Sequence, residues 1–218
     1  MSTSQIEFRV ASLEDMDKMK DFFMEGHYSS GDPMVVELVK RKFWTLNDFN
    51  ELFASFVDED ALQYGLSTIA TVNGKVVGAF VNFPIYTKAV EAKFIVPDDH
   101  PSKPMSQVLS YLHTQVNPNV YPSSRPGCAW AILSVSSEFR RKGIAQKLCE
   151  LAHEAAKNYG CSFIKLITSS KFSNRLFKEK LGFEEIADIA YKDICFQNAH
   201  VFEDIEVHTH AAFLLKIL

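Results

Sequence analysis

The stretch "SEFRRKGIAQKLCELA", residues 137–152, runs from three adjacent cations through a glycine into a helical pattern. The apolar positions that begin in this stretch recur at spacings of four, three and four: Ile144, Leu148, Leu151 and Ala155. Such spacing predicts an amphipathic helix that begins near Ile144. The preceding segment "CAWAILSV", residues 128–135, is nearly continuously apolar, which is typical of a strand buried on both faces. These residues therefore predict a buried strand, a cationic turn and a helix.

The cationic turn contains Arg140, Arg141, Lys142 and Gly143. A run of cations is often only a solvated turn. A helix N-terminus, however, offers unpaired backbone N–H groups and a partial positive charge, so the same turn can bind an anion. Gly143 would let a ligand approach the backbone, and the arginines would add charge-assisted hydrogen bonds. Since neither GxxxxGK[ST] nor GxGxxG occurs, the pattern predicts a pyrophosphate site of another kind.

The composition is that of an ordinary globular protein. The chain has 218 residues, of which 47% are hydrophobic and 23% are charged, and we expect one domain over residues 1–218. A net charge of -4 argues against a nucleic-acid partner, because nucleic-acid-binding domains are usually basic. The cationic turn is therefore a local feature.

Cysteine spacing and the N-terminus bear on metal binding and location. The four cysteines show no CxxC or Cys/His ligand spacing, so we expect free thiols and no metal site. The opening residues "MSTSQIEFRV" contain no apolar signal core, and no run reaches the roughly 18 apolar residues that span a bilayer. We expect a cytoplasmic protein without a membrane partner, either a monomer or a weak homodimer.

The rest of the chain alternates strand and helix signals. Ser12 and Asp15 predict a helix start after a strand at residues 6–10, and a second helix is predicted from Val35 to Leu46, continuing around residues 49–57. Asn73-Gly74 predicts a hairpin with a type I′ turn. Residues 87–127 contain a predicted helix at 105–116 and are interpreted as an insertion over the sheet, although the sequence equally permits a linker between domains. A strand at 162–168, a helix at 173–183 closed by Gly182, and β-rich runs at 185–196 and 207–218 complete the pattern.

Two motifs resemble a known family. "RRKGIA", residues 140–145, matches the [QR]xxGx[GA] pyrophosphate motif of the GNAT superfamily of acetyl-CoA-dependent N-acetyltransferases, and "SNRLFKEKLGF" resembles that family's N-x-x-x-[YF]-x-x-x-GF helix. Their order and spacing agree over the core segment, residues 128–183. "FFMEGHYSSGDPM" and the segment 200–218 resemble the matching parts of invertebrate arylalkylamine (dopamine-type) N-acetyltransferases.

The resemblance implies a GNAT-like α/β (α+β) fold with a mixed, mostly antiparallel central sheet flanked by helices. It also implies that acetyl-CoA is the acyl donor. The backbone of Leu133, Ser134 and Val135 would pair with the pantetheine arm like an added strand. Pyrophosphate binding is implied for the turn and the helix start: Arg140, Arg141, Lys142, Gly143, Ile144 and Ala145. Asn174 would hydrogen-bond the cofactor near its thiol, or would simply stand at a helix start without a ligand.

Acetyl transfer to an amine needs a base, a donor to the carbonyl oxygen and an acid. An amine with a pKa near 10 is mostly protonated at neutral pH, so a base or a water relay must remove a proton. The Val135 amide is the expected donor to the carbonyl oxygen. Many family members supply the acid from a tyrosine, but Phe177 stands at that position here. Ser169 and Ser173 match the serines implicated in the arylalkylamine subfamily, or else they only cap the helix.

The base and the acceptor pocket have competing candidates. Asp32 occupies the acidic-proline position of the subfamily in "GDPM", Glu25 is its rival, and either is equally compatible with an ordinary surface carboxylate. His208 and His210 are two residues apart in a β-rich run, so they are predicted to share a strand face. We expect Glu25 and His208 near the acceptor, although a strand histidine is more often structural.

The predicted acceptor is a small primary amine that carries an aromatic ring, as the subfamily resemblance implies. The 18 phenylalanines permit an aromatic pocket but are equally explained by core packing. A polyamine or a protein N-terminus remains an alternative acceptor, because acidic residues in 21–32 and 57–60 could converge on a long cation. A non-catalytic CoA-binding module is the alternative from a different class.

Overall fold

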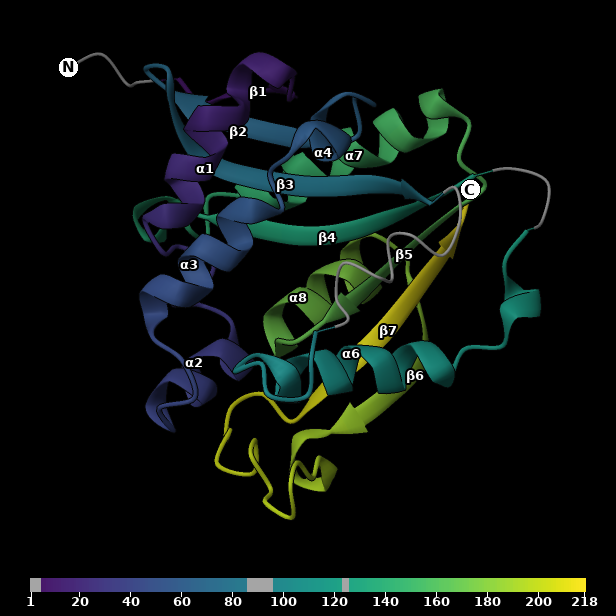
Figure 1. Ribbon diagram of the computed structural model, residues 1–218. Coiled ribbons are helices and arrows are strands. Elements are labelled where there is room, and N and C mark those ends of the chain that lie inside the picture. Colours follow the sequence, from purple (N-terminus) through teal and green to yellow (C-terminus); the bar gives the residue numbers. More distant parts are fainter. Residues whose placement is uncertain (1–4, 86–95, 123–125) are drawn as a thin grey trace.

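The computed structural model describes residues 5–85, 96–122 and 126–218. Within these ranges seven strands form one sheet in the order β1-β2-β3-β4-β5-β7-β6 (Figure 1). The strands are β1 Glu7–Val10, β2 Thr68–Val72, β3 Lys75–Ile85, β4 Gly127–Val135, β5 Phe163–Thr168, β6 Glu184–Ala190 and β7 His210–Ile217. Among them β4 and β5 are the one parallel pair, and every other pairing is antiparallel. The mixed, mostly antiparallel sheet is thus confirmed.

Helices cover both faces of this sheet. The α-helices in the described ranges are α1 Met16–Met24, α2 Pro33–Lys40, α3 Leu46–Ser55, α4 Glu59–Leu62, α6 Lys103–Thr114, α7 Ile144–Tyr159 and α8 Lys171–Arg175. Short 3-10 turns are Leu13–Asp15, Pro118–Val120, Ser137–Phe139 and Tyr191–Asp193. None of these helices is long and apolar enough to cross a bilayer.

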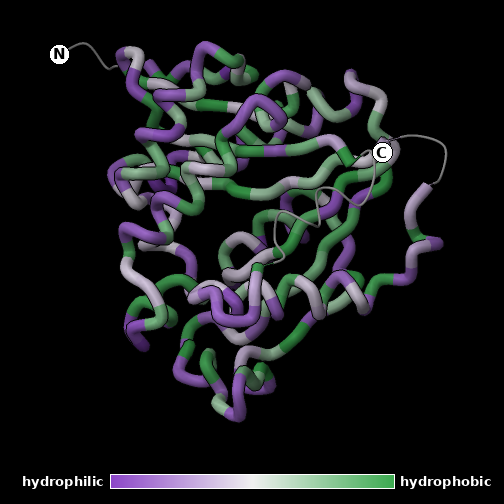
Figure 2. Tube along the Cα trace, viewed as in Figure 1, coloured by the Kyte–Doolittle hydropathy of each residue, from purple (hydrophilic) through white to green (hydrophobic). Residues whose placement is uncertain are grey.

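Two apolar cores lie on the two faces. One contains Met19, Phe53 and Val108 from α1, α3 and α6. The other contains Ile144, Leu148 and Ala152 from α7. Ile144 and Leu148 were predicted for this face, whereas the predicted Leu151 and Ala155 are only half-buried. Hydrophobic residues follow the central strands between these cores (Figure 2). A sheet buried on both faces explains the nearly continuous apolar run in β4.

Several local predictions are confirmed. Asn73 and Gly74 both have positive φ, 51° and 79°, as a type I′ turn requires. Ser12 and Asp15 form a capping box before α1. All four cysteines are free thiols. The predicted helix in the insertion is α6, which packs against β6 and β7, whereas residues 87–95 and 123–125 of the insertion lie outside the described residues.

Two element predictions were wrong in their bounds. The helix predicted from Val35 through Leu46 ends at Lys40, because Lys42 adopts φ of 60° and Thr45 begins a new helix, α3, with a Thr45–Asp48 capping box. The helix predicted at 173–183 begins earlier, at Lys171, and its second half, Leu176–Lys180, is a π-helical turn. Gly182 follows it with φ of 70°, as predicted for a helix end.

Asp15 gives a stability prediction. Both of its oxygens accept from the Arg9 guanidinium at 2.6 Å, which lowers the pKa of this buried carboxyl to about 2. A carboxyl whose pKa is lowered on folding stabilises the fold above its ordinary pKa and loses that contribution as the pH falls toward the folded value. We expect Asp15→Asn to reduce the free energy of unfolding at pH 7 by about 2 kcal/mol.

Urea denaturation from pH 7 to pH 2 measures this effect. The difference between wild type and Asp15→Asn should shrink as the pH falls from about 4 toward 2. Asp48→Asn is the matched control, since Asp48 closes the same kind of capping box but is only half-buried and accepts from Thr45 rather than from an arginine. Equal losses in the two variants would contradict the assigned role of Arg9.

Candidate active site

The sheet opens between its two parallel strands. Pairing of β4 with β5 runs from Gly127 opposite Phe163 to Trp130 opposite Leu166, and Figure 1 shows the strands diverging beyond this point. Ser136 N–H donates to Val77 O on the β3 side at 2.9 Å. Along a strand, the N–H and C=O groups of one residue point to one edge, and those of the next residue point to the other edge. Since Ser136 faces β3, Val135 and Leu133 direct their backbone groups into the opening. That edge can receive an extended, amide-bearing ligand as an added strand.

The cationic turn follows β4 directly. Gly143 has φ of 78° and precedes α7, a helix of 16 residues. A side chain built there would meet no atom within 4 Å, so this glycine leaves open space above the first turn of the helix. Lys147 N–H donates to Gly143 O, which is the first hydrogen bond of the helix. The backbone N–H groups that come before Lys147 in the first turn have no partner within the helix. These groups fit the pyrophosphate of a CoA-type donor.

The three cations of the turn are arranged differently. Arg140 donates through Nε to Val135 O at 3.2 Å and through Nη2 to His27 O at 3.0 Å. Lys142 Nζ lies 4.5 Å from the centre of the Phe139 ring. Arg141 makes no hydrogen bond or ion pair with the residues that the structure describes, and its φ is 62°. Arg141 and Lys142 are thus the cations that remain available to an anion, while Arg140 is engaged with backbone carbonyls.

Two cavities meet in the opening. The large cleft, of about 320 Å³, is lined by the α1–α2 connection, the end of β4 and the start of α8, including Tyr28, Val135 and Ser173. The inner pocket, of about 90 Å³, is mostly apolar and is lined by Met34, Phe53, Met105, Leu109, Ile132 and Phe213 among others. Both cavities share Tyr28, Asp32, Trp130, Ala131, Leu166, Ile167 and Ser169. A ligand in one cavity can therefore reach a ligand in the other at this shared wall.

Asp32 is the buried carboxylate of the shared wall. It is 5% exposed and caps α2, since Oδ1 accepts from Val35 N–H at 3.0 Å. Oδ2 accepts from Ser169 Oγ and, at 3.3 Å, from the Tyr28 hydroxyl. Burial raises the pKa of Asp32, and the hydrogen bonds from Ser169 and the backbone oppose that rise. A carboxyl with a raised pKa beside two cavities has the properties of a general base.

Local structure explains how these groups meet. Asp32 N–H donates to Tyr28 O at 3.0 Å, so a helical turn places the two side chains on one side. Pro33 then begins α2, which leaves Asp32 as its N-cap. Tyr191 donates its hydroxyl to Ser169 O, and burial raises the pKa of Tyr191 well above its ordinary value. Sequence reasoning missed Tyr28 and Tyr191, although the four-residue spacing of Tyr28 from Asp32 was a usable signal.

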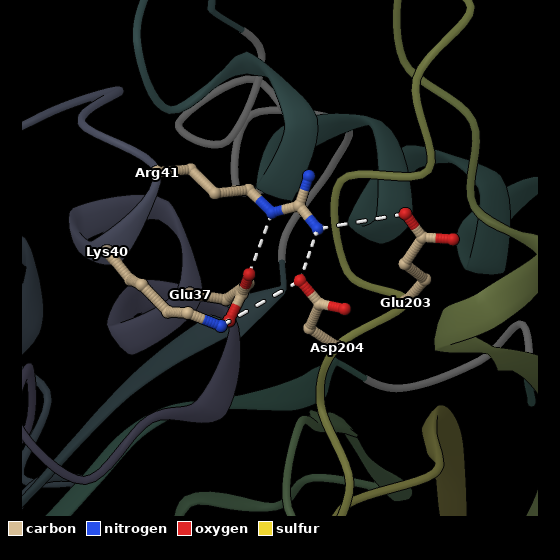
Figure 3. Close-up of polar contacts among 5 residues, drawn as sticks. All are labelled: Glu37, Lys40, Arg41, Glu203 and Asp204. Atoms are coloured by element: carbon tan, nitrogen blue, oxygen red, sulfur yellow. Dashed lines mark hydrogen bonds and ion pairs between the residues drawn. The ribbon is translucent and has the colours of Figure 1, made fainter.

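The helix capped by Asp32 is also fixed at its other end (Figure 3). Arg41 Nε donates to the buried carboxylate of Glu37 at 2.7 Å, and Arg41 Nη2 contacts Asp204 Oδ2 at 3.0 Å. Lys40 and Glu203 extend this network between α2 and the β6–β7 connection. The network therefore joins the segment that carries the candidate base to the segment that precedes His208.

Other predicted site residues lie around the shared wall. Glu25 is not among the described lining residues of either cavity: it is exposed, and it pairs with Lys75 at 2.8 Å and with His27 at 2.9 Å. The hydrogen bond from Lys75 is the main cause that lowers the pKa of Glu25. Ser173 lines the large cleft, but its hydroxyl contacts Ser170 O at 2.9 Å, and Ser170 caps α8. Of the two predicted serines, only Ser169 contacts Asp32.

The prediction that His208 and His210 share a strand face was wrong, because β7 begins at His210 and His208 precedes it. His208 Nδ1 instead accepts from Lys171 N–H at 3.1 Å, at the start of α8. Asn174 Nδ2 contacts Thr168 Oγ1 at 3.4 Å and Glu185 Oε2 at 3.2 Å. The side chains of His208 and Asn174 thus make hydrogen bonds that connect α8 to neighbouring segments.

Phe177 stands at the position where the family that the sequence resembles often carries a tyrosine. It is 4% exposed and packs against Trp130 and Phe183, with ring centres 5.9 Å and 5.6 Å away. The Phe177 ring lines the large cleft without offering a hydroxyl. Phe177 therefore offers no proton donor to the cleft.

A mixed sheet that opens between two parallel strands, beside a glycine-containing turn at a helix N-terminus, is the arrangement that the resemblance to acetyl-CoA-dependent transferases implies. The model of the Acetyltransferase (GNAT) family matches residues 33–183. The chain belongs to this family and is an acetyltransferase. Acetyl-CoA is the donor that the family uses.

Solved structures share the fold over nearly the whole chain. Arylalkylamine N-acetyltransferase 2 from Aedes aegypti is 22% identical, with a TM-score of 0.78 over 98% of this chain and 99% of that one. A mosquito arylalkylamine N-acetyltransferase-like 5b is 23% identical, with a TM-score of 0.76 over 98% and 100%. The Drosophila melanogaster polyamine N-acetyltransferase, which forms N-acetylagmatine, is 16% identical, with a TM-score of 0.74 over 98% and 100%. At these identities the likeness concerns the fold.

Proposed function

We propose that this protein transfers an acetyl group from acetyl-CoA to a small primary amine that carries an aromatic ring. The observation that carries the proposal is Asp32, a buried carboxylate bonded to Ser169 on the wall shared by the large cleft and the inner pocket. A donor in the large cleft and an amine in the inner pocket would meet beside this carboxylate. Proximity of this kind is a large part of catalysis in acyl transfer.

Acetyl-CoA supplies an activated acetyl thioester when bound. The backbone edge at Leu133 and Val135 would hold its pantetheine arm, with Val135 O shared between the arm and Arg140 Nε, and the amides from Arg141 to Ala145 would hold its pyrophosphate. Arg141 and Lys142 would add positive charge there. Val135 N–H, which faces the opening, would stabilise negative charge on the carbonyl oxygen. Asn174 would have to exchange its contacts with Thr168 and Glu185 to reach the donor.

Asp32 and Ser169 are the two residues that would transfer protons during the reaction. An ammonium nitrogen loses two protons on becoming an amide: one would leave to solvent before the attack, and Asp32 would take the other, directly or through water, as the amide forms. The raised pKa of Asp32 improves its match to that task. Ser169 would give its hydroxyl proton to the leaving sulfur and recover one from Asp32, to which it is already hydrogen-bonded. The Tyr28 hydroxyl would hold Asp32 in place during both transfers.

The inner pocket favours an aromatic acceptor over a polyamine. Among the described residues that line it, Asp32 is the one carboxylate, and the others are mostly apolar. Lys165, which is 5% exposed, also lines this pocket. A polyamine would bring a second cation into this apolar and lysine-containing space, and burying a charge there is costly. An aromatic ring would instead bury apolar surface.

A panel of amines with detection of the released thiol tests the proposal. We expect tyramine, dopamine, tryptamine and serotonin to exceed spermidine and peptide amines in kcat/KM by about tenfold or more, since a charged tail would lack partners in the pocket. Leu109→Trp, which fills the inner pocket, should lower kcat/KM for tyramine while acetyl-CoA binds as before. A preference for spermidine or a peptide would contradict the acceptor. Acetyl-CoA binding without thiol release from any amine would indicate a non-catalytic module.

A further inference from the structure

Arg140 joins two parts of the site that are far apart in the sequence. Its guanidinium donates to Val135 O at the end of β4 and to His27 O in the connection between α1 and α2, which is 113 residues away. A guanidinium presents several N–H donors in a fixed planar arrangement, so one side chain can hold two carbonyl groups in a defined relation. The contact therefore fixes the peptide that precedes Tyr28 against the strand that faces the donor.

The held peptide begins the turn that ends in Asp32. Gly31 N–H and Asp32 N–H both donate to Tyr28 O, at 2.8 Å and 3.0 Å, and the Tyr28 hydroxyl donates to Asp32. A shift of the His27–Tyr28 peptide would therefore be transmitted to the carboxylate through this turn. Displacements of about 1 Å at reacting groups can cost up to about 100-fold in rate.

Gly31 gives independent evidence that the guanidinium packs against this turn. A Cβ atom built at Gly31 would lie 3.0 Å from Arg140 Nη2. The φ of Gly31 is outside the left-handed region, so its backbone conformation does not itself require glycine. The missing side chain instead leaves the space that the Arg140 guanidinium occupies.

We propose that Arg140 is a positioning residue that ties the Asp32 turn to the end of β4, rather than a ligand of the donor's phosphates. Its neighbour Arg141 is then the cation that serves the anion, because it makes no polar side-chain contact with the described residues. This assignment rests on the proposed role of Asp32. The proposal gives the two adjacent arginines of one motif different tasks: Arg140 positions the candidate base, and Arg141 binds the donor.

Arg140→Gln and Arg141→Gln form the matched pair that tests this division. We expect Arg140→Gln to lower kcat/KM for tyramine about tenfold while changing the Kd of acetyl-CoA less than about threefold. Arg141→Gln should weaken acetyl-CoA binding about threefold to tenfold, which is a larger change in that Kd than Arg140→Gln causes. Arg140→Lys keeps the charge but loses the planar fork, so it should behave like Arg140→Gln.

Amide hydrogen exchange tests the tether without any amine. Arg140→Gln should speed exchange at Gly31 and Asp32, whose N–H groups close the turn, and Arg141→Gln should not. Unchanged exchange at these amides would overturn the proposal. It would also be overturned if Arg140→Lys had wild-type kinetics while Arg140→Gln bound acetyl-CoA weakly, because the charge of Arg140 would then serve the donor. Failure of the proposed function would look different, because wild-type protein itself would then turn over no aromatic amine.

Discussion

Asp32→Asn is expected to lower kcat/KM for tyramine by about 100-fold or more. The asparagine can still cap α2 and accept from Val35 N–H, so the fold should be kept while the ability to take a proton is lost. The raised pKa of Asp32 also predicts the shape of the pH profile. Activity should rise with pH as Asp32 deprotonates, with this limb at a higher pH than an ordinary aspartate would give, and the limb should be absent in Asp32→Asn. Steady-state kinetics from pH 5 to pH 9 measure both effects.

Two variants control this experiment. Asp58 caps α4 through Ala61 N–H at 3.0 Å and is not a described lining residue of either cavity, so Asp58→Asn should leave kcat/KM within about twofold of wild type. Glu25→Gln tests the rival base. Lys75 lowers the pKa of Glu25, so a limb due to Glu25 would lie at a lower pH. Full activity in Asp32→Asn together with loss in Glu25→Gln would transfer the role to Glu25.

Local features of the chain were predictable because neighbouring residues determine them. The cationic turn with Gly143, the Asn73-Gly74 hairpin and the Ser12–Asp15 capping box each depend on a few adjacent residues whose conformational preferences agree. The apolar spacing also located α7, although Ala152 and Ala156 continue its buried face in place of the predicted Leu151 and Ala155. These elements supply the donor side of the site.

The acceptor side could not be read in the same way. The contact between Ser169 and Asp32 spans 137 residues and depends on how α2 packs against the end of β5. Sequence alone favoured Asp32 over its rival Glu25, through the subfamily resemblance, but it could not bring either carboxylate together with Ser169. The break between α2 and α3 was missed because the apolar spacing continues across it, although Thr45 and Asp48 were a readable capping box. His208 was placed in a strand because the apolar run that follows it gave no sign of where β7 begins.

Gly143→Glu is expected to weaken acetyl-CoA binding by about 100-fold or more. The new side chain would occupy the open space above the first turn of α7, and its carboxylate would repel a pyrophosphate at the positive end of the helix. Glutamate at φ of 78° also strains the backbone, so a loss of binding could arise from strain alone.

Gly160→Glu separates these causes. Gly160 caps the other end of the same helix with φ of 89°, and a side chain there also meets no atom within 4 Å. Both variants therefore add one negative charge and a similar backbone strain to α7, but only Gly143→Glu does so beside the cationic turn. Calorimetric titration should give a Kd for acetyl-CoA within about twofold of wild type for Gly160→Glu, because no donor contact is lost at that end. Equal weakening in both variants would move the donor site away from Gly143, whereas loss in Gly143→Glu alone would locate the pyrophosphate at the start of α7.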